Sequence, residues 1–357
     1  MLLLVWANKY KYKVYKAIVK LLLAACCCSI YSCHPKKTVR TITPSFYYWK
    51  SEFAVTAFER SQLDLLHVKT LYIKFFDVDW DRDKQQPLPK AKISFKDSSY
   101  THFAIIPTIF ITNECIKTID SAQIDTLAEK MIALYKQIIA DNRIDSVQEV
   151  QFDCDWSSTT KDKYFLLLSR FKQLQPGVAT SATIRLHQIK FMGKTGVPPV
   201  NRGLLMCYNM GNLKNPATQN SIIETAELQK YIGQLNNYPM PLDVALPLFD
   251  WQVLFRKNVY AGLIGNLPDS ILEGPLFEKK GNRYRVMQNG LVGGYTLQKD
   301  DVLRNERSDY ATIISTASAI SRQLKNTSLR VSLYHLDSLI LKKYSLHELE
   351  TVFNSLR

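Results

Sequence analysis

The chain has 357 residues, of which 46% are hydrophobic and 22% are charged, and its formal net charge is +14. This composition is ordinary for a globular protein, and the length suffices for one large domain. The basic residues form no arginine-rich run and no nucleic-acid motif, so we predict no nucleic-acid partner and interpret the charge as a general surface property.

The first 32 residues are typical of an export signal. Five lysines and no acidic residue occur there, and the apolar run Ala17–Tyr31 is interrupted only by Lys20. This run is too short, and too charged at its start, for a convincing membrane span. We predict a signal peptide over residues 1–32, and an ordinary N-terminal anchor helix is the alternative.

The cysteines near the end of this run indicate a lipid anchor. The segment Ile30–Cys33 resembles a bacterial lipobox, in which the cysteine is acylated and becomes the first residue of the mature protein. Leu23–Cys26 fits the consensus better, but Cys33 follows the longer apolar run. We predict lipidation of Cys33, with Cys26 as the alternative, and a tether over residues 33–44. The expected location is the cell envelope, anchored in the membrane and facing the periplasm.

Beyond the tether, strand-like and helix-like segments alternate, which is typical of a parallel α/β architecture. The strands are predicted over Phe46–Trp49, Leu71–Asp79, Phe103–Ile111, Val147–Asp155, Ala179–Leu186, Arg202–Asn209, Val244–Leu248 and Arg330–Tyr334. The helices are predicted over Phe53–Leu66, Ile124–Ala140, Lys161–Leu174, Ile222–Leu235, Ser308–Leu324 and Ser345–Leu356.

Eight strands in this order predict an α/β fold, a (β/α)8 TIM barrel occupying residues 45–357. Residues 252–306 depart from the alternation, because they are rich in glycine and contain short β-like runs such as Tyr284–Met287. We therefore expect a β-rich insertion between strands seven and eight.

The fourth predicted strand alternates strictly between polar and apolar residues. Val150, Phe152 and Cys154 share one face, and the opposite face carries Glu149, Gln151, Asp153 and Asp155. In a barrel the apolar face packs on the outer helices and the polar face points inward. Lys74 and Arg185 share the inward parity and are candidate counter-ions for the two aspartates. An ion network with a purely structural role is the competing interpretation.

Four tryptophans follow predicted strand ends, the face on which barrel enzymes build their sites. They are Trp49, Trp80, Trp156 and Trp251. Aromatic faces can stack on the C–H faces of sugar rings, while nearby carboxylates and amides bind the hydroxyls. For any single ring, capping of the barrel is the simpler explanation, but the collection of all four at strand ends favours a carbohydrate site.

Acidic residues gather at the same strand ends. They are Asp77, Asp79, Asp81, Asp153, Asp155, Asp250 and Asp337. Glycoside hydrolysis needs a carboxylic acid near a second carboxylate or a participating substrate group. Asp153, Asp155, Asp77 and Asp79 are the candidate catalytic residues, whereas helix capping or loop solvation is the preferred interpretation of Asp81 and Asp250.

The remaining cysteines and the histidines predict no metal site. Cys115, Cys154 and Cys207 are widely spaced in predicted strands or at their edges, so we expect buried free thiols. The histidines are isolated, and no HExxH or CxxC pattern occurs. We predict no cofactor.

The strand-end residues resemble those of the chitinase-like family 18 glycoside hydrolases. Asp153-Cys154-Asp155-Trp156-Ser157 is similar to that family's strand-four motif D-x-D-W-E. Met206-Cys207-Tyr208-Asn209 is similar to its strand-six M-x-Y-D, and Leu246-Pro247-Leu248-Phe249 to its strand-seven P-x-Y-G. The chain looks closer still to a group of bacterial barrel lipoproteins to which no function has been assigned.

The resemblance implies that Asp155 would hold the acetamido group of an N-acetylated sugar, and that Tyr208 and Asn209 would contact the same group. The family's proton donor, however, is the final glutamate of the motif, and Ser157 stands in its place. A serine hydroxyl cannot supply a proton at neutral pH as a glutamic acid can.

Three functional hypotheses follow. The first is a lipoprotein that binds a carbohydrate or peptidoglycan-type glycan without the usual acid catalysis, through Trp49, Trp80, Trp156, Tyr208, Asn209, Trp251 and Arg185. The second is an active glycoside hydrolase with a displaced acid, Asp77, Asp79 or Asp250. The third is a non-catalytic scaffold of the envelope. The missing glutamate favours binding.

Overall fold

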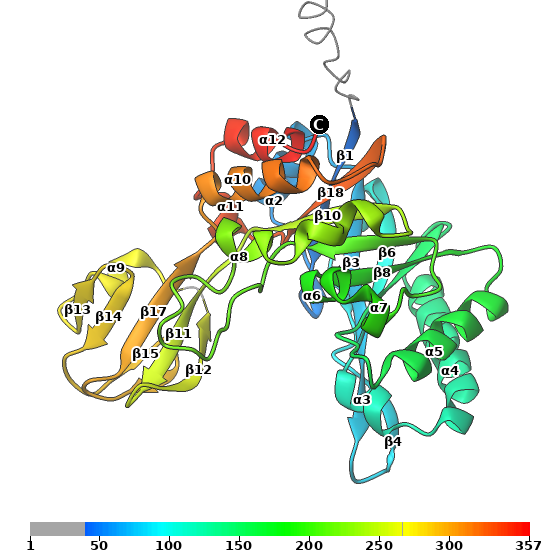
Figure 1. Ribbon diagram of the computed structural model, residues 1–357, viewed down its shortest axis with the longest axis horizontal. Helices are drawn as coiled ribbons and strands as arrows, with labels where there is room; N and C mark the ends of the chain where they lie inside the picture. Colours follow the sequence, from blue (N-terminus) through cyan, green and yellow to red (C-terminus); the bar gives the residue numbers. More distant parts are fainter. Residues whose placement is uncertain (1–39, 266) are drawn as a thin grey trace, which may run out of the picture. The chain divides into compact units, whose positions relative to one another are not determined.

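A computed structural model describes residues 40–265 and 267–357. Eight parallel strands form the barrel: β1 (Thr41–Tyr48), β3 (Thr70–Asp81), β6 (Ala104–Ile111), β7 (Glu149–Asp153), β8 (Ala179–Arg185), β9 (Arg202–Met206), β10 (Leu242–Pro247) and β18 (Ser328–Tyr334). β1 pairs with both β3 and β18, so the first and last strands lie side by side and the sheet closes (Figure 1). The predicted (β/α)8 fold class is confirmed.

Helices follow most of the strands. They are α2 (Ala57–Leu65), α3 (Asn113–Thr118), α4 (Ile124–Asp141), α5 (Lys161–Leu174), α6 (Leu186–Lys190), α7 (Met192–Thr195), α8 (Thr225–Gln229), α10 (Tyr310–Ser321), α11 (Ser338–Leu341) and α12 (Leu346–Asn354). Helix α4 shows the apolar periodicity that predicts a helix. Its buried residues recur every three or four positions and include Leu127, Met131, Tyr135 and Ile138. None of the helices in the described residues is long and apolar enough to span a membrane.

The insertion is an antiparallel sheet in the order β12-β11-β17-β14-β13. Its strands are β11 (Asp250–Arg256), β12 (Val259–Gly265), β13 (Phe277–Lys280), β14 (Arg283–Val286) and β17 (Val302–Arg307), joined by α9 (Asp269–Leu272) and the hairpin β15 (Gly290–Val292) and β16 (Tyr295–Leu297). It has its own small core, which includes Ile264, Val286 and Leu303. The β-rich insertion between strands seven and eight is confirmed.

Several predicted boundaries differ from the structure. β1 begins at Thr41, within the predicted tether, because its pairing with β18 extends down to Ser328. Helix α2 begins later than expected, since Thr56 forms a capping box with Glu59. The helix predicted over 222–235 is replaced by α8 and the short 3-10 helix Ile232–Asn237, which contains Gly233, a residue unfavourable in helices.

The segment after β3 is also more regular than expected. β4 (Gln86–Lys90) pairs antiparallel with the end of β3, and its two prolines are tolerated because it is an edge strand. β2 (Glu52–Phe53) pairs with β5 (Ser94–Phe95), and a 3-10 helix covers Ser99–His102. The predicted signal peptide, Cys26 and Cys33 lie outside the described residues.

The inward direction of the polar face of β7 is established by contacts that cross the barrel. β7 is bordered by β6 and β8, yet Glu149 binds Arg330 of β18 at 2.6 Å, and Gln151 accepts a hydrogen bond from the Tyr47 hydroxyl of β1. Arg330 also binds Asp243 at 3.0 Å, and Arg202 binds the same carboxylate at 2.9 Å. We call Glu149, Arg202, Asp243 and Arg330 the lower ion network, because they lie near the N-terminal ends of their strands.

Candidate functional site

Asp153, the last residue of β7, and Asp155, which follows the strand, have different surroundings. Asp153 is buried, and its carboxylate accepts a hydrogen bond from Thr183 Oγ1 at 2.6 Å. Burial raises the pKa of Asp153 to about 6, and the negative charge of Asp155 acts in the same direction. The side chain of Asp155 is 52% exposed. Arg185 donates hydrogen bonds to both of its carboxylate oxygens, with Nη2 at 3.0 Å from Oδ2. Of the two candidate counter-ions, Arg185 therefore pairs with Asp155 and its charge lowers the pKa of Asp153, whereas Lys74 pairs with Asp77.

Asp155 and Arg185 line a cavity of about 500 Å³ at the C-terminal ends of the barrel strands. His187 of α6 extends the same side, and burial lowers the pKa of His187, which favours its neutral form. The rest of the lining comes from the irregular segment 207–224, here called the β9–α8 loop, and from the insertion sheet. These contribute Asn209, Gly211, Leu213, Ser221, Trp251 and Leu263. We refer to this cavity as the cleft.

The β9–α8 loop folds back on itself where it meets the cleft. Asn209 has a φ of +53°, a left-handed conformation that asparagine tolerates better than most residues, and its N–H donates to Ile222 O at 2.8 Å. Gly211 lies against the returning arm, and a Cβ there would be 2.9 Å from Ser221 Cα. Both residues keep the two arms close together, so the loop presents a defined surface to the cleft.

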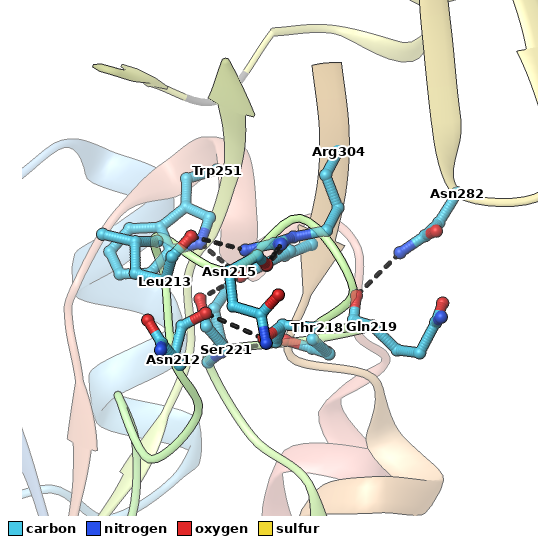
Figure 2. A network of polar contacts seen from close by, with 12 residues as sticks. Asn212, Leu213, Asn215, Thr218, Gln219, Ser221, Trp251, Asn282 and Arg304 are labelled. Atoms are coloured by element: carbon cyan, nitrogen blue, oxygen red, sulfur yellow. Dashed lines mark hydrogen bonds and ion pairs between the residues drawn. The ribbon is translucent and has the colours of Figure 1, made fainter. Parts of the chain in front are cut away.

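Two charged residues of β17, which are absent from the predicted site, connect this loop to the insertion sheet. Arg304 is fully buried, and its guanidinium donates to Leu213 O at 2.9 Å and to Asn215 O at 2.7 Å (Figure 2). Glu306 binds Arg304 Nε at 2.5 Å and accepts a hydrogen bond from Trp251 Nε1 at 2.7 Å. The available signal was a pair of opposite charges at i and i+2 on one face of a β-like run.

Aromatic rings fill the mouth of the barrel beside the cleft. Tyr208 stacks on Tyr334 with ring centroids 5.0 Å apart, and Trp49 lies 5.7 Å from Tyr334. Lys74 places its ammonium 5.7 Å from the centre of the Trp49 ring and binds Asp77 at 3.0 Å. The predicted residues Trp49, Tyr208 and Asp77 thus lie together, although Tyr208 is buried.

The expectation that Trp156 contacts a ligand is wrong. Its side chain is fully buried, stacks on Tyr164 at 5.2 Å and donates its indole N–H to Thr195 O at 3.0 Å. The reason is the parity of the strand. If Asp155 points inward, the next residue points outward and packs against the helices.

Two further predicted residues are held at the β4 edge. Asp79 binds Lys90 at 2.8 Å and Thr112 Oγ1 at 2.9 Å, and the hydrogen bond from Lys90 lowers the pKa of Asp79. Trp80 is mostly buried and pairs across the strands with Pro87. Neither residue lines the cleft. Their contacts indicate a role in holding the β3–β4 hairpin.

The other acids have structural partners. Asp81 accepts hydrogen bonds from the N–H groups of Asp83 and Lys84, so it stabilises the turn between β3 and β4 and caps no helix. Asp250 is buried and binds Lys343 at 2.6 Å, so the expectation of capping or solvation was wrong for this residue. Asp337 caps α11 and binds Lys50 at 3.1 Å.

Ser157, at the position of the family's proton donor, lies in the turn before α5. Its hydroxyl is 2.9 Å from Thr159 Oγ1, and its backbone N–H donates to Thr160 Oγ1 at 2.9 Å. The three free cysteines of the described region, Cys115, Cys154 and Cys207, are buried as predicted. No group of three or more histidine, cysteine, aspartate or glutamate residues in this region is placed to hold a metal ion.

Comparison with solved structures gives the same fold. The spore cortex-lytic enzyme SleL of Bacillus cereus superposes with a TM-score of 0.53 at 14% identity, over 90% of this chain and 76% of that one. A chitinase of Bacteroides thetaiotaomicron gives 0.52 at 11% identity over 88% and 96% of the two chains. A chitinase of Chromobacterium violaceum gives 0.50 at 9% identity over 88% and 98%.

These identities show a shared fold, and the predicted resemblance to the chitinase-like barrels of family 18 is confirmed at that level. No family model matches the chain, and no curated protein matches it.

Proposed function

We propose that this protein is a lipoprotein of the cell envelope whose barrel binds an N-acetylated glycan in the cleft, without the acid catalysis of chitinase-like enzymes. The observation that carries the proposal is the grouping of Asp155, Arg185, Asn209 and Trp251 around one cavity of about 500 Å³. These four residues come from different barrel connections, yet they meet at the face where barrel proteins build their sites.

The cleft has the chemistry that sugar binding needs. Trp251 contributes an indole to its lining, and Asp155, Arg185 and His187 contribute a carboxylate, a guanidinium and an imidazole. Such a cavity can stack an apolar sugar face while polar groups bind the hydroxyl and acetamido substituents. The structural neighbours are named as chitinases and as a spore cortex-lytic enzyme, which supports a polymeric N-acetylated sugar as the ligand.

The same residues argue against ordinary hydrolysis. Ser157 cannot replace the family's acid, and both oxygens of Asp155 are engaged by Arg185. Asp153 has a raised pKa but is buried beneath the cleft and does not line it. Asp79 and Asp250 are held in ion pairs. Ligand binding therefore fits the arrangement better than proton transfer does.

Calorimetric titration of the full chain in detergent tests the proposal. Chitohexaose and soluble peptidoglycan fragments should bind saturably, and cellohexaose, which lacks acetamido groups, should bind at least tenfold more weakly. Trp251→Ala should weaken binding at least tenfold because it removes the indole wall. Tyr295→Ala, which alters an exposed aromatic residue of the β15–β16 hairpin, should leave the affinity unchanged.

Absence of saturable binding to every glycan would overturn the proposal and favour the scaffold hypothesis. One observation favours the hydrolase alternative, namely that the carboxyl of Asp153 holds its proton up to a pH of about 6. Mass spectrometry of chitohexaose after prolonged incubation decides between binding and hydrolysis. Shortened products that disappear in Asp153→Asn would establish hydrolysis.

The lipid anchor is a separate part of the proposal, supported by the sequence around Cys33. Cells that express the protein and receive alkyne-labelled palmitate should yield a labelled chain. Cys33→Ala should abolish the label, and Cys26→Ala should retain it. The opposite result would move the anchor to Cys26, and labelling of both variants would contradict acylation at a single cysteine.

A further inference from the structure

Glu306 is 1% exposed, and three donors share its carboxylate. Arg304 Nε lies 2.5 Å from Oε1, and Oε2 accepts from Trp251 Nε1 at 2.7 Å and from Ser221 Oγ at 2.5 Å. Trp251 and Ser221 both line the cleft, and they belong to different segments of the chain. One buried carboxylate thus joins the two parts of the cleft wall.

Arg304 extends the connection to the backbone of the β9–α8 loop. Its guanidinium lies 5.0 Å from the centre of the Phe255 ring, and its remaining N–H groups donate to the carbonyls of Leu213 and Asn215. Two more side chains of the sheet reinforce the contact. Asn282 donates to Gln219 O at 2.8 Å, and Arg283 donates to Thr218 O at 3.0 Å.

We propose that Glu306 and Arg304 are positioning residues, which fix the Trp251 indole and the β9–α8 loop as one rigid wall of the glycan cleft. This inference rests on the proposed function of the cleft. A buried ion pair contributes little net stability compared with apolar packing, so stability alone is a weak explanation for it. Fixing the indole and the loop before a ligand arrives reduces the ordering entropy that binding costs.

The geometry of Trp251 explains how the effect is transmitted. An indole has a single hydrogen-bond donor, and here Glu306 holds it. Phe249 meets the ring at 5.2 Å in an edge-on arrangement, which limits its tilt. Without the carboxylate the ring keeps its apolar contacts and loses the bond that sets its rotation.

A variant pair separates positioning from general stability. Glu306→Gln removes the negative charge and leaves one acceptor oxygen in place of the two that receive Arg304 Nε, Trp251 Nε1 and Ser221 Oγ. Asp301→Asn is the matched control, because Asp301, directly before β17, is also buried and binds an arginine, Arg256, at 2.8 Å. The two readouts are the affinity for chitohexaose and the indole N–H resonance of Trp251 in a 15N-labelled protein, assigned from its disappearance in Trp251→Phe.

We expect Glu306→Gln to shift the Trp251 indole resonance upfield and to weaken chitohexaose binding about tenfold, and Asp301→Asn to change neither. In the Trp251→Phe background, Glu306→Gln should weaken binding less than it does in the parent, because the indole is gone and only the bonds of Glu306 to Ser221 and Arg304 remain to be lost. Glu306→Asp keeps a charge for Arg304, so it provides a second test if the glutamine variant fails to fold. It should move the same resonance.

An unchanged Trp251 resonance in both Glu306 variants would overturn the positioning role. So would a tenfold loss of affinity that persists undiminished in the Trp251→Phe background. If the unaltered protein binds no glycan, the proposed function fails, and the resonance still decides whether Glu306 holds the indole.

Discussion

The two ends of the β7 segment carry acids of the same parity with opposite accessibility. Glu149 lies in the lower ion network, where Arg330 binds it at 2.6 Å and its side chain is 11% exposed. Asp155 meets Arg185 in a similar pair, but its side chain is 52% exposed and it lines the cleft. An inward-facing charge in a barrel is therefore not evidence of a site. A functional role is indicated only where the charged side chain also lines a cavity, as Asp155 does.

The lower network should be a matter of folding alone, and this sets the largest expected effect. Arg330→Met leaves Glu149 buried without its cation, which should reduce the free energy of unfolding by about 3–5 kcal/mol. Urea unfolding followed by circular dichroism measures the loss, and the folded fraction should bind chitohexaose as before. A reduction of the free energy of unfolding by less than about 1 kcal/mol would show that the lower ion network is accessible to water.

Asp153 lies between the two ends, and its stability contribution should depend on pH. Its pKa is raised to about 6 in the folded protein and is near 3.8 when exposed, so between these values the folded state binds more protons. The contribution of Asp153 to stability should thus fall as pH rises from about 4 to 6, by about 3 kcal/mol in total.

Asp153→Asn isolates this effect, because asparagine keeps the oxygen that accepts from Thr183. Urea unfolding of both proteins from pH 4 to 8 should show the variant gaining stability relative to the parent as pH rises, up to about pH 6, with no further change above it. A constant difference across the range would mean that Asp153 titrates as an exposed acid.

The comparison of Trp156, in the core, with Trp251, in the cleft, provides the next test. Trp156→Phe removes the hydrogen bond to Thr195 O from a fully buried site, so about 1–3 kcal/mol of stability should be lost. Chitohexaose affinity should not change, in contrast to Trp251→Ala. A tenfold loss of affinity in Trp156→Phe would indicate that the core beneath the cleft is coupled to binding.

The smallest effect on stability is expected at the mouth. Asp155→Asn removes the charge of a carboxylate that is 52% exposed and paired with Arg185, which should change the free energy of unfolding by about 1 kcal/mol. Binding of an N-acetylated glycan should nevertheless fall at least tenfold if the cleft uses this carboxylate. Equal affinity in calorimetry would remove Asp155 from the site and leave the wall of Trp251 as its only supported part.

Sequence patterns predicted whether a side chain points into the barrel better than they predicted its position along the barrel axis. The alternation in β7 predicted the inward face, and the contacts of Glu149 and Gln151 across the barrel confirm it. The same alternation, applied one residue further, predicts that Trp156 points outward, as it does, whereas its position at a strand end predicts a place in the site. Height along the barrel axis depends on strand lengths and on the loops above, which residue parity does not encode.

The wall of the cleft was the least predictable part. Trp251 was selected from its position after a strand, whereas Arg304 and Glu306 carried only a charge pattern that is also typical of exposed strands. Their burial results from the β9–α8 loop packing against the insertion sheet, and these segments are about 90 residues apart in the sequence. A local sequence pattern cannot predict a contact between segments so far apart in the chain.

The bonds that hold the β9–α8 loop have a practical consequence. Arg304, Arg283 and Asn282 all donate to main-chain carbonyls of the loop, and those acceptors are present whatever side chains the loop carries. Leu213, which faces the cavity, can therefore be exchanged while the path of the backbone is preserved. A combinatorial library at Leu213 and its exposed neighbours is a direct route to engineered variants with altered ligand selectivity.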